Sequence, residues 1–355
     1  MSATNPTENA NQVSKHLNRL KIAAVVLTSI GICLFLYFIY AVGVREIIAG
    51  IGRIGFEGFA VVLFIYFLRM IIRGWSWGLA VHEPYSLSLR DTVPAVIIGE
   101  ALSSIIPLGF VVSGTSKAVA VKRRVPLVVG LSSIATENLI YSFATGIFVA
   151  IGGIAFLRSF DLADGWKLTI DIMLGVIFLL LFLGVLMVIR QWHFASATCD
   201  WLYDRGHLKG LLEHGRLQAR LFENLIYGFY RRYPQRFLPI LGGQVIFHAL
   251  GVSEVMYLLW KLGETPSAFS AMLLESVSRL ITIVFKLVPF LIGVDEAGAQ
   301  FVTDALAIGT AVGVTLAIIR KGRILFWAVV GVLLIVKRGL SLAEIRNIVL
   351  PKSHE

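Results

Sequence analysis

Residues 99–114 read Gly-Glu-Ala-Leu-Ser-Ser-Ile-Ile-Pro-Leu-Gly-Phe-Val-Val-Ser-Gly, and residues 275–298 repeat the same order of residue types. The second stretch reads Glu-Ser-Val-Ser-Arg-Leu-Ile-Thr-Ile-Val-Phe-Lys-Leu-Val-Pro-Phe-Leu-Ile-Gly-Val-Asp-Glu-Ala-Gly. Each begins with an acid and small hydroxyl residues, continues to a proline, and ends in glycines. Proline removes a backbone donor and glycine relaxes the backbone, so each stretch predicts a broken helix. Pro107 and Pro289 lie about half a chain length apart, which indicates a duplicated architecture.

The rest of the chain is too apolar for a soluble protein. Of its 355 residues, 57% are hydrophobic and only 15% are charged, whereas a soluble domain carries about 25% charged residues. At about 20 residues per crossing, this content supplies about seven to ten membrane segments. The sequence therefore predicts an all-α, polytopic helical membrane protein. Its two pseudo-repeated halves would each contain a Pro/Gly-broken, re-entrant helix.

Apolar and polar runs divide the chain into five parts. Residues 1–19 predict a disordered cytoplasmic tail, 20–189 a first membrane half, and 190–236 a basic amphipathic insert. Residues 237–340 predict a second membrane half and 341–355 a polar C-terminal tail. The predicted spans are Leu20–Val42, Phe56–Val81, Thr92–Val112, Val125–Phe156, Leu168–Ile189, Phe237–Trp260, Ala268–Ile292, Ala297–Ile319 and Ile324–Val336.

The chain is basic, with 32 Lys and Arg against 22 Asp and Glu. Its cations cluster between apolar runs, where the positive-inside rule and anionic lipids explain them without a nucleic-acid partner. Lys15 and Arg19 place the N-terminus in the cytoplasm, and residues 117–124 and 320–323 predict further inside loops. In residues 190–236, arginines alternate with aromatic residues. This mixture predicts one or two interfacial amphipathic helices, which serve either as a plain inside loop or in recognising lipid headgroups.

No motif in the sequence indicates a cofactor, a metal or a catalytic residue. Gly50-Ile-Gly52-Arg-Ile-Gly55 matches the dinucleotide fingerprint, but that motif works only between a strand and a helix. Here it joins two membrane helices, so we interpret it as an interhelical turn. The seven histidines are scattered without metal-ligand spacing. We therefore expect a protein without cofactor or metal, and not an enzyme.

Charged residues inside apolar runs are the strongest functional signal. An ionisable group at the bilayer centre costs about 2.5–3.5 kcal/mol, so it is normally paired or faces a polar cavity. Glu137 fits a helix-packing hydrogen bond as well as a transport role. Glu100, which precedes the first proline by seven residues, has no such structural explanation and is the leading functional candidate.

The acids of the second stretch each have a structural alternative. Glu275 and Arg279 are four residues apart, which predicts an ion pair within one helix. Asp295 and Glu296 stand where a new helix would begin after Gly293, so they either cap that helix or contact a substrate.

These runs resemble a known family. The order Pro289, Gly293, Glu296 is similar to the P-x-x-x-G-x-x-E signature of the lysylphosphatidylglycerol synthase transmembrane region, also called the flippase-like domain family, which includes hopanoid-associated members. Arg323 followed by Gly331 is similar to the closing helix of that family. The earlier positions that match its polar residues are Arg90, Pro107, Gly114, Lys117 and Glu137.

The resemblance covers roughly residues 20–340 and implies a lipid-handling membrane protein. Relatives carry an acid in a G-G-E-x-x-R-like run where this chain reads Ser113-Gly114-Thr115-Ser116-Lys117, which leaves the ligand of the first half open. The soluble aminoacyl-transferase domain of the two-part synthases is missing from the sequence, so lipid aminoacylation is not expected.

Together these observations predict a multi-pass protein of the bacterial inner (cytoplasmic) membrane that moves lipids with polar or anionic headgroups. Its partners would be membrane lipids, and its many glycines fit either close helix contacts within the chain or a homo-oligomer. Two alternatives stay open: a lipid-modifying enzyme that uses Glu100 and Glu296 as acid and base, or a scaffold that gathers envelope-lipid enzymes through residues 190–236. The expected substrate-binding residues are Glu100, Pro107, Gly109, Gly114, Lys117, Glu137, Glu275, Arg279, Lys286, Pro289, Gly293, Asp295, Glu296 and Arg323.

Overall fold

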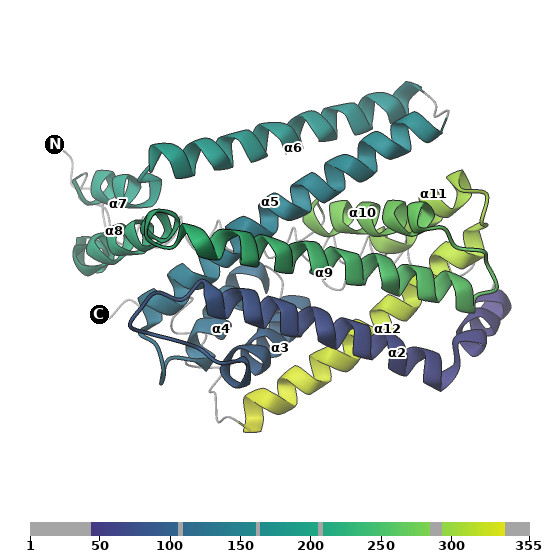
Figure 1. Cartoon of the computed structure of the whole chain (residues 1–355), viewed down its shortest axis with the longest axis horizontal. Helices are drawn as coiled ribbons and strands as arrows, with labels where there is room; N and C mark the ends of the chain where they lie inside the picture. The colour runs from purple at the N-terminus through teal and green to yellow at the C-terminus, as the bar shows by residue number, and fades with distance from the viewer. Residues whose placement is uncertain (1–43, 106–108, 161–163, 205–208, 285–292, 338–355) are drawn as a thin grey trace, which may run out of the picture.

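The computed structural model describes residues 44–105, 109–160, 164–204, 209–284 and 293–337. Every regular element in these ranges is an α-helix, which confirms the all-α prediction (Figure 1). The helices are α2 (Val44–Leu79), α3 (Leu89–Ile105), α4 (Gly109–Ala120), α5 (Leu127–Ser159), α6 (Asp164–Arg190), α7 (Phe194–Asp204), α8 (Lys209–Arg232), α9 (Pro234–Lys261), α10 (Ala268–Val284), α11 (Val294–Ala305) and α12 (Thr310–Lys337).

Within the described ranges, four helices are long and apolar enough to cross a membrane. They contain the segments Ile51–Leu79, Leu127–Ser159, Lys167–Arg190 and Pro234–Lys261. The third segment, in α6, packs against α5 and exposes large apolar side chains along its length, as hydrocarbon-facing helices do. The chain is therefore a membrane protein. The predicted span Leu20–Val42 lies outside the described residues.

The two proline-containing stretches interrupt helices where the sequence predicted breaks. The predicted span Thr92–Val112 is not one helix, because α3 ends at Ile105 and α4 begins at Gly109. The predicted span Ala268–Ile292 is helical only to Val284, and the residues after it lie outside the described part of the chain. In both halves a helix of 17 residues is followed by one of 12 residues.

The sequence-based division of the last helices was wrong. The predicted spans Ala297–Ile319 and Ile324–Val336 do not exist as such, because α11 ends at Ala305 and α12 continues unbroken from Thr310 to Lys337. The cations at 320–323 were assigned to a cytoplasmic loop, but they lie within α12 and are buried. The positive-inside rule applies to solvated loops, and it fails here because acids on other helices pair with these cations.

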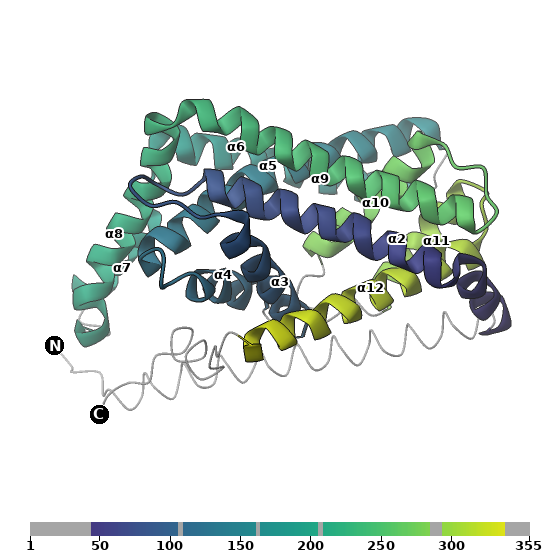
Figure 2. The same ribbon diagram turned by 60° about the horizontal axis from the view of Figure 1, so that its bottom comes forward.

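One structural unit occurs twice, and the second copy is inverted. Each unit is a long helix, two short helices and another long helix: α2 to α5 in the first half, α9 to α12 in the second. We call α3–α4 the first hairpin and α10–α11 the second hairpin, since the two members of each pack against one another. Helices α2 and α9 lie side by side and run in opposite directions, and the hairpins lie on opposite sides of the middle of the molecule (Figures 1 and 2). This arrangement is typical of inverted-repeat transporters.

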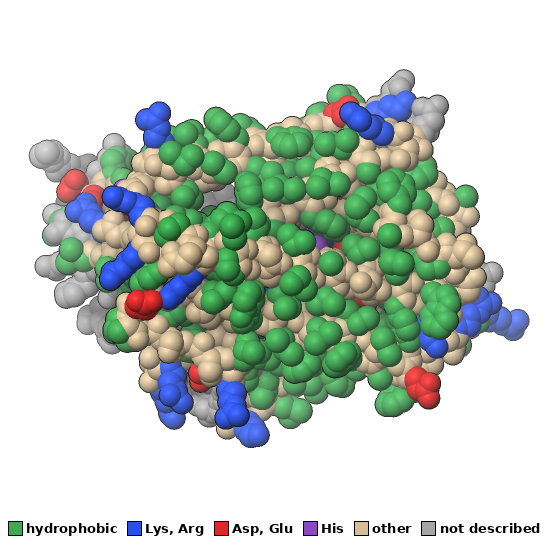
Figure 3. Space-filling view, viewed as in Figure 1, with side chains coloured by type: hydrophobic (Ala, Val, Ile, Leu, Met, Phe, Trp, Pro, Cys, Tyr) green, Lys and Arg blue, Asp and Glu red, His purple; other side chains and the backbone are tan. Residues whose placement is uncertain are grey.

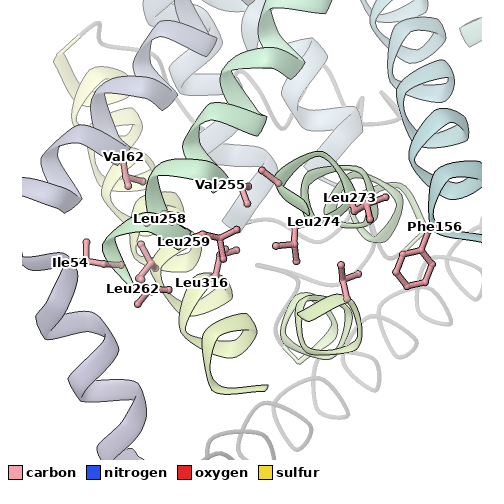
Figure 4. Packing of buried hydrophobic residues seen from close by; sticks show 13 residues of the cluster. Ile54, Val62, Phe156, Val255, Leu258, Leu259, Leu262, Leu273, Leu274 and Leu316 are labelled. Carbon is pink, nitrogen blue, oxygen red and sulfur yellow. The ribbon is translucent and has the colours of Figure 1, made fainter. Parts of the chain in front are cut away.

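Apolar packing holds the second hairpin against the long helices. Val62 of α2, Leu258 of α9, Leu274 of α10 and Leu316 of α12 are buried in one cluster (Figure 4). On the other side, α12 approaches α3 through Gly331. A Cβ at this position would lie 2.3 Å from the Cβ of an alanine on α3, so the close contact requires glycine.

The insert between the halves folds as two helices, α7 and α8, which pack against each other and, through α8, against α5. They lie at one end of the molecule (Figure 1). Leu217 and Leu221 of α8 are exposed, so α8 presents apolar residues together with its arginines, as predicted for an amphipathic helix. The Gly50–Gly55 run is no separate turn, because α2 continues through a kink at Gly55, whose φ is 62°.

Candidate functional site

Glu275 of α10 lies at the centre of a buried ion-pair network. Its Oε1 accepts hydrogen bonds from Arg69 Nη2 at 3.1 Å and from Arg279 Nη2 at 2.7 Å. Its Oε2 accepts one from Arg320 Nη2 at 3.0 Å. The predicted pair of Glu275 with Arg279 is confirmed, but the same carboxylate also joins α2 and α12. With the residue only 1% exposed, three guanidinium groups take the place of water around it.

A second acid, Glu254 of α9, completes this cluster. It forms an ion pair with Arg323 of α12 and lies 3.6 Å from Arg69 Nη1. Arg320 also donates a hydrogen bond to Ser278. The arginine cluster, as we name it, consists of Arg69, Glu254, Glu275, Arg279, Arg320 and Arg323.

Backbone and aromatic groups shape the arginine cluster. Gly251 of α9 lies directly against it, because a Cβ there would be 2.3 Å from Glu275 Oε1 and 3.1 Å from Arg69 Nη1. Arg69 lies 4.2 Å from the ring centroid of Phe247, and Arg323 lies 4.1 Å from that of Tyr66. Such cation–π contacts stabilise a desolvated guanidinium by about 2 kcal/mol, so these rings partly replace water around the two arginines.

Arg73, one helical turn after Arg69 on α2, lies at the centre of a second group of ion pairs, which includes residues of the first hairpin. Its Nε and Nη2 donate to the two oxygens of Glu137 at 3.2 and 3.0 Å, and Glu137 Oε1 also accepts from Gln244 of α9 at 3.1 Å. Glu100 of α3 lies 3.6 Å from Arg73 Nη1 and 3.9 Å from Lys117 Nζ of α4. The Glu100 side chain is 30% exposed, whereas that of Glu137 is 4% exposed. Glu100 is thus the more accessible of the two acids.

The start of α11 forms a third group of polar residues. Glu296 accepts a hydrogen bond from the backbone N–H of Gly293 at 2.8 Å, and its other oxygen pairs with Lys321 of α12 at 2.7 Å. Gly293 has a φ of 81°, a conformation that favours glycine. The capping alternative is therefore confirmed for Glu296. Asp295, next to it, is buried as well.

The structure places six of the predicted site residues in two groups of ion pairs. Glu275, Arg279 and Arg323 belong to the arginine cluster, and Glu100, Lys117 and Glu137 lie in the group around Arg73. Gly293, Asp295 and Glu296 lie at the start of α11. Gly109 begins α4, and a Cβ added to Gly114 of the same helix would lie 3.9 Å from Ile134 Cγ2. Pro107, Lys286 and Pro289 lie outside the described residues.

Sequence reasoning missed five residues of these groups. Arg69 and Arg73 stand inside the second apolar run, and Glu254 stands inside the run that became α9. The rule that a charge in an apolar run needs a partner would have selected all three. Arg320 and Lys321 gave no such signal, because a basic cluster at that spacing also fits a cytoplasmic loop.

Comparison with known proteins agrees with this architecture. A family model described as the lysylphosphatidylglycerol synthase TM region matches residues 21–332. The matched range contains both hairpins and every residue of the network. No curated protein and no solved structure matches the chain.

Proposed function

This chain belongs to the lysylphosphatidylglycerol synthase TM-region family, and on that premise we propose that it is a lipid translocase. It would move lipids with polar or anionic headgroups across the bacterial inner membrane, with its N-terminus in the cytoplasm. The lipid would leave chemically unchanged, so the protein would act as a transporter and not as an enzyme. Family membership supports lipid handling, and the buried network supports translocation.

The observation that carries the proposal is a charged interior in an otherwise apolar membrane protein. Arg69, Arg73 and Glu275 lie on helices that expose apolar side chains on their outer sides, and each is held in ion pairs inside the molecule. Burying several charges costs far more than apolar packing of the same volume, so a merely structural role is a poor explanation. A polar headgroup crossing a membrane needs groups of this kind on its path.

The inverted hairpins suggest how the path opens to each side in turn. The first hairpin contributes Glu100 and the second contributes Glu275 and Arg279, and Arg73 and Arg69 on α2 connect the two groups. We propose that the headgroup replaces individual ion-pair partners while its acyl chains stay in the lipid. Movement of one half against the other would then pass the headgroup from one hairpin to the other.

The enzyme alternative requires Glu100 and Glu296 to act on one reacting bond. Glu100 pairs with Arg73 and Lys117, while Glu296 pairs with Lys321 and caps α11. Since each carboxylate is held by different cations on different helices, we favour transport over acid–base chemistry.

The test is lipid transfer in proteoliposomes that carry a fluorescent headgroup-labelled phospholipid. Added dithionite bleaches only the outer leaflet, so a translocase raises the bleached fraction above one half. We expect wild-type protein to do so within minutes and empty vesicles not to. Equal traces for the two would refute the proposed function.

A matched pair of variants connects transfer to the network. Glu100→Gln removes the most exposed acid of the ion-pair groups, on α3, whereas Glu57→Gln removes an exposed acid on α2. We expect Glu100→Gln to slow transfer and Glu57→Gln to leave it unchanged. Wild-type rates for both would exclude Glu100 from the path.

A further inference from the structure

The arginine cluster does not balance its own charge. It holds four arginines, from α2, α10 and α12, against the two glutamates of α9 and α10. It therefore carries two more positive than negative charges. An uncompensated charge at membrane depth is strongly unfavourable, so a built-in excess needs an explanation.

Neighbouring acids do not remove this excess. Arg73 and Lys117 are matched by Glu100 and Glu137. Lys321 is matched by Glu296, and Asp295 is the further buried acid at the start of α11. With all of these counted, the seven cations named here still exceed the six acids by one.

Two of the arginines also keep donors without an acceptor. Among the described residues, the Nε–H groups of Arg69 and Arg323 have no hydrogen-bond partner, although the two residues are only 1% and 6% exposed. Leaving a buried donor unsatisfied is destabilising, and more so when the donor is charged. Both donors belong to planar guanidinium groups, which bind the oxygens of a phosphate or carboxylate in pairs.

We infer that the arginine cluster is a binding site for the phosphate of a net-anionic lipid headgroup. This inference rests on the proposed function and narrows its substrate class from polar lipids in general to anionic phospholipids. The phosphate would accept from the free Arg69 and Arg323 donors and offset the surplus positive charge. A zwitterionic or cationic headgroup would leave the surplus in place.

The surroundings of the cluster favour a lipid over a free phosphate. Arg279 is its most accessible arginine, with a side chain 15% exposed. In Figure 3, a few histidine and acidic atoms are visible between apolar side chains near the centre of this face, where α9 passes α5 and α10. Ile151 of α5 and Ile283 of α10 are 53% and 52% exposed, so these helices offer apolar surface for acyl chains while the headgroup reaches inward.

The test measures lipid binding to the purified full-length protein in detergent by native mass spectrometry. The probes are phosphatidylglycerol, phosphatidic acid and phosphatidylcholine with the same acyl chains, and inorganic phosphate. We expect both anionic lipids to bind at least tenfold more tightly than phosphatidylcholine. Equal affinity for all three lipids overturns the inference. Equal affinity for inorganic phosphate and the anionic lipids would mean that the site binds free phosphate and not a lipid headgroup.

Two variants with opposite expected effects place the binding in the cluster. Arg279→Gln lowers the positive excess and should weaken phosphatidylglycerol binding about 10- to 100-fold, the loss of one charge-assisted contact. Glu254→Gln raises the excess and should strengthen it, an effect that loss of structure does not produce. The matched control is Arg158→Gln, which removes an exposed arginine in the last turn of α5, away from the cluster and from the basic insert, and should bind as the wild type does.

The outcomes separate this inference from the proposed function. If Arg279→Gln binds as tightly as the wild type, or if Glu254→Gln binds anionic lipid less tightly while folded, the site is wrong. If Arg279→Gln does not fold, the direction of the Glu254→Gln change decides. Selective binding without any transfer in proteoliposomes would support the anion site and refute translocation. Transfer without selective binding would support translocation and refute the anion site.

Discussion

Replacing Glu275 by Gln removes a buried carboxylate that three arginines share. The carboxylate accepts from three arginines at 2.7–3.1 Å and is almost fully buried. The amide that replaces it is neutral, so the positive excess of the arginine cluster rises from two to three. Removing one partner of a buried ion pair costs about 3–5 kcal/mol, because the other charge stays desolvated. We expect a loss of that size in the free energy of unfolding of Glu275→Gln.

The assay is reversible unfolding in mixed micelles, followed by tryptophan fluorescence. Glu57→Gln is the control, since Glu57 is exposed on α2 and surface substitutions change stability by about 0.5 kcal/mol or less. A double variant, Glu275→Gln with Arg320→Gln, removes one charge of each sign. If the ion pair is real, the double variant loses less than the sum of its single variants, by about 1 kcal/mol or more.

Two results would refute this reasoning. A Glu275→Gln protein within about 0.5 kcal/mol of the wild type would mean that the three arginines do not depend on the carboxylate. Strict additivity of the Glu275 and Arg320 variants would mean that the two residues do not interact.

Three further predictions test separate parts of the structure. Gly331→Ala should lower the free energy of unfolding by about 1–3 kcal/mol through overpacking against α3, whereas Gly184→Ala on α6, with nothing within 4 Å of its Cβ position, should be neutral or stabilising in thermal unfolding. Lys321→Gln leaves buried Glu296 without its cation and should lower the unfolding midpoint at pH 7, with recovery at acidic pH, where the carboxyl group is protonated; no recovery would contradict a charge effect. Burial, together with the charges of two nearby arginines, lowers the pKa of His82, which follows α2 outside its membrane-spanning segment. The unfolded histidine then binds protons first, so stability should fall as the pH drops below about 6.5 and through the lower folded pKa, and His82→Gln should flatten that part of the stability–pH curve.

The hairpins could be predicted from sequence because their causes are local. A proline interrupts a helix through its own ring, and glycines nearby allow the break, so the end of α3 at Ile105 and the start of α4 at Gly109 follow from residues 99–114 alone. The same applies to the Glu275–Arg279 pair and to the Glu296 cap, whose partners are four and three residues away.

The network could not be predicted because its pairs are distant in sequence. Arg69 and Glu275 are 206 residues apart, and only the packed fold brings them together. The segment 320–323 of α12 resembles a cytoplasmic loop for the same reason. The sequence around Arg320 does not reveal the acid on α10 that pairs with it. A single sequence shows which charges need partners, and the fold shows which partners they have.

The most direct test of the central claim is an experimental structure of the protein in nanodiscs that contain phosphatidylglycerol. The claim is that a lipid headgroup enters the polar interior between the two hairpins. It predicts phosphate density within hydrogen-bond distance of Arg69, Arg279 or Arg323, with acyl chains leading out past α5 and α10. Lipid density confined to the outer apolar surface, with the ion pairs closed and no headgroup between the hairpins, would contradict it.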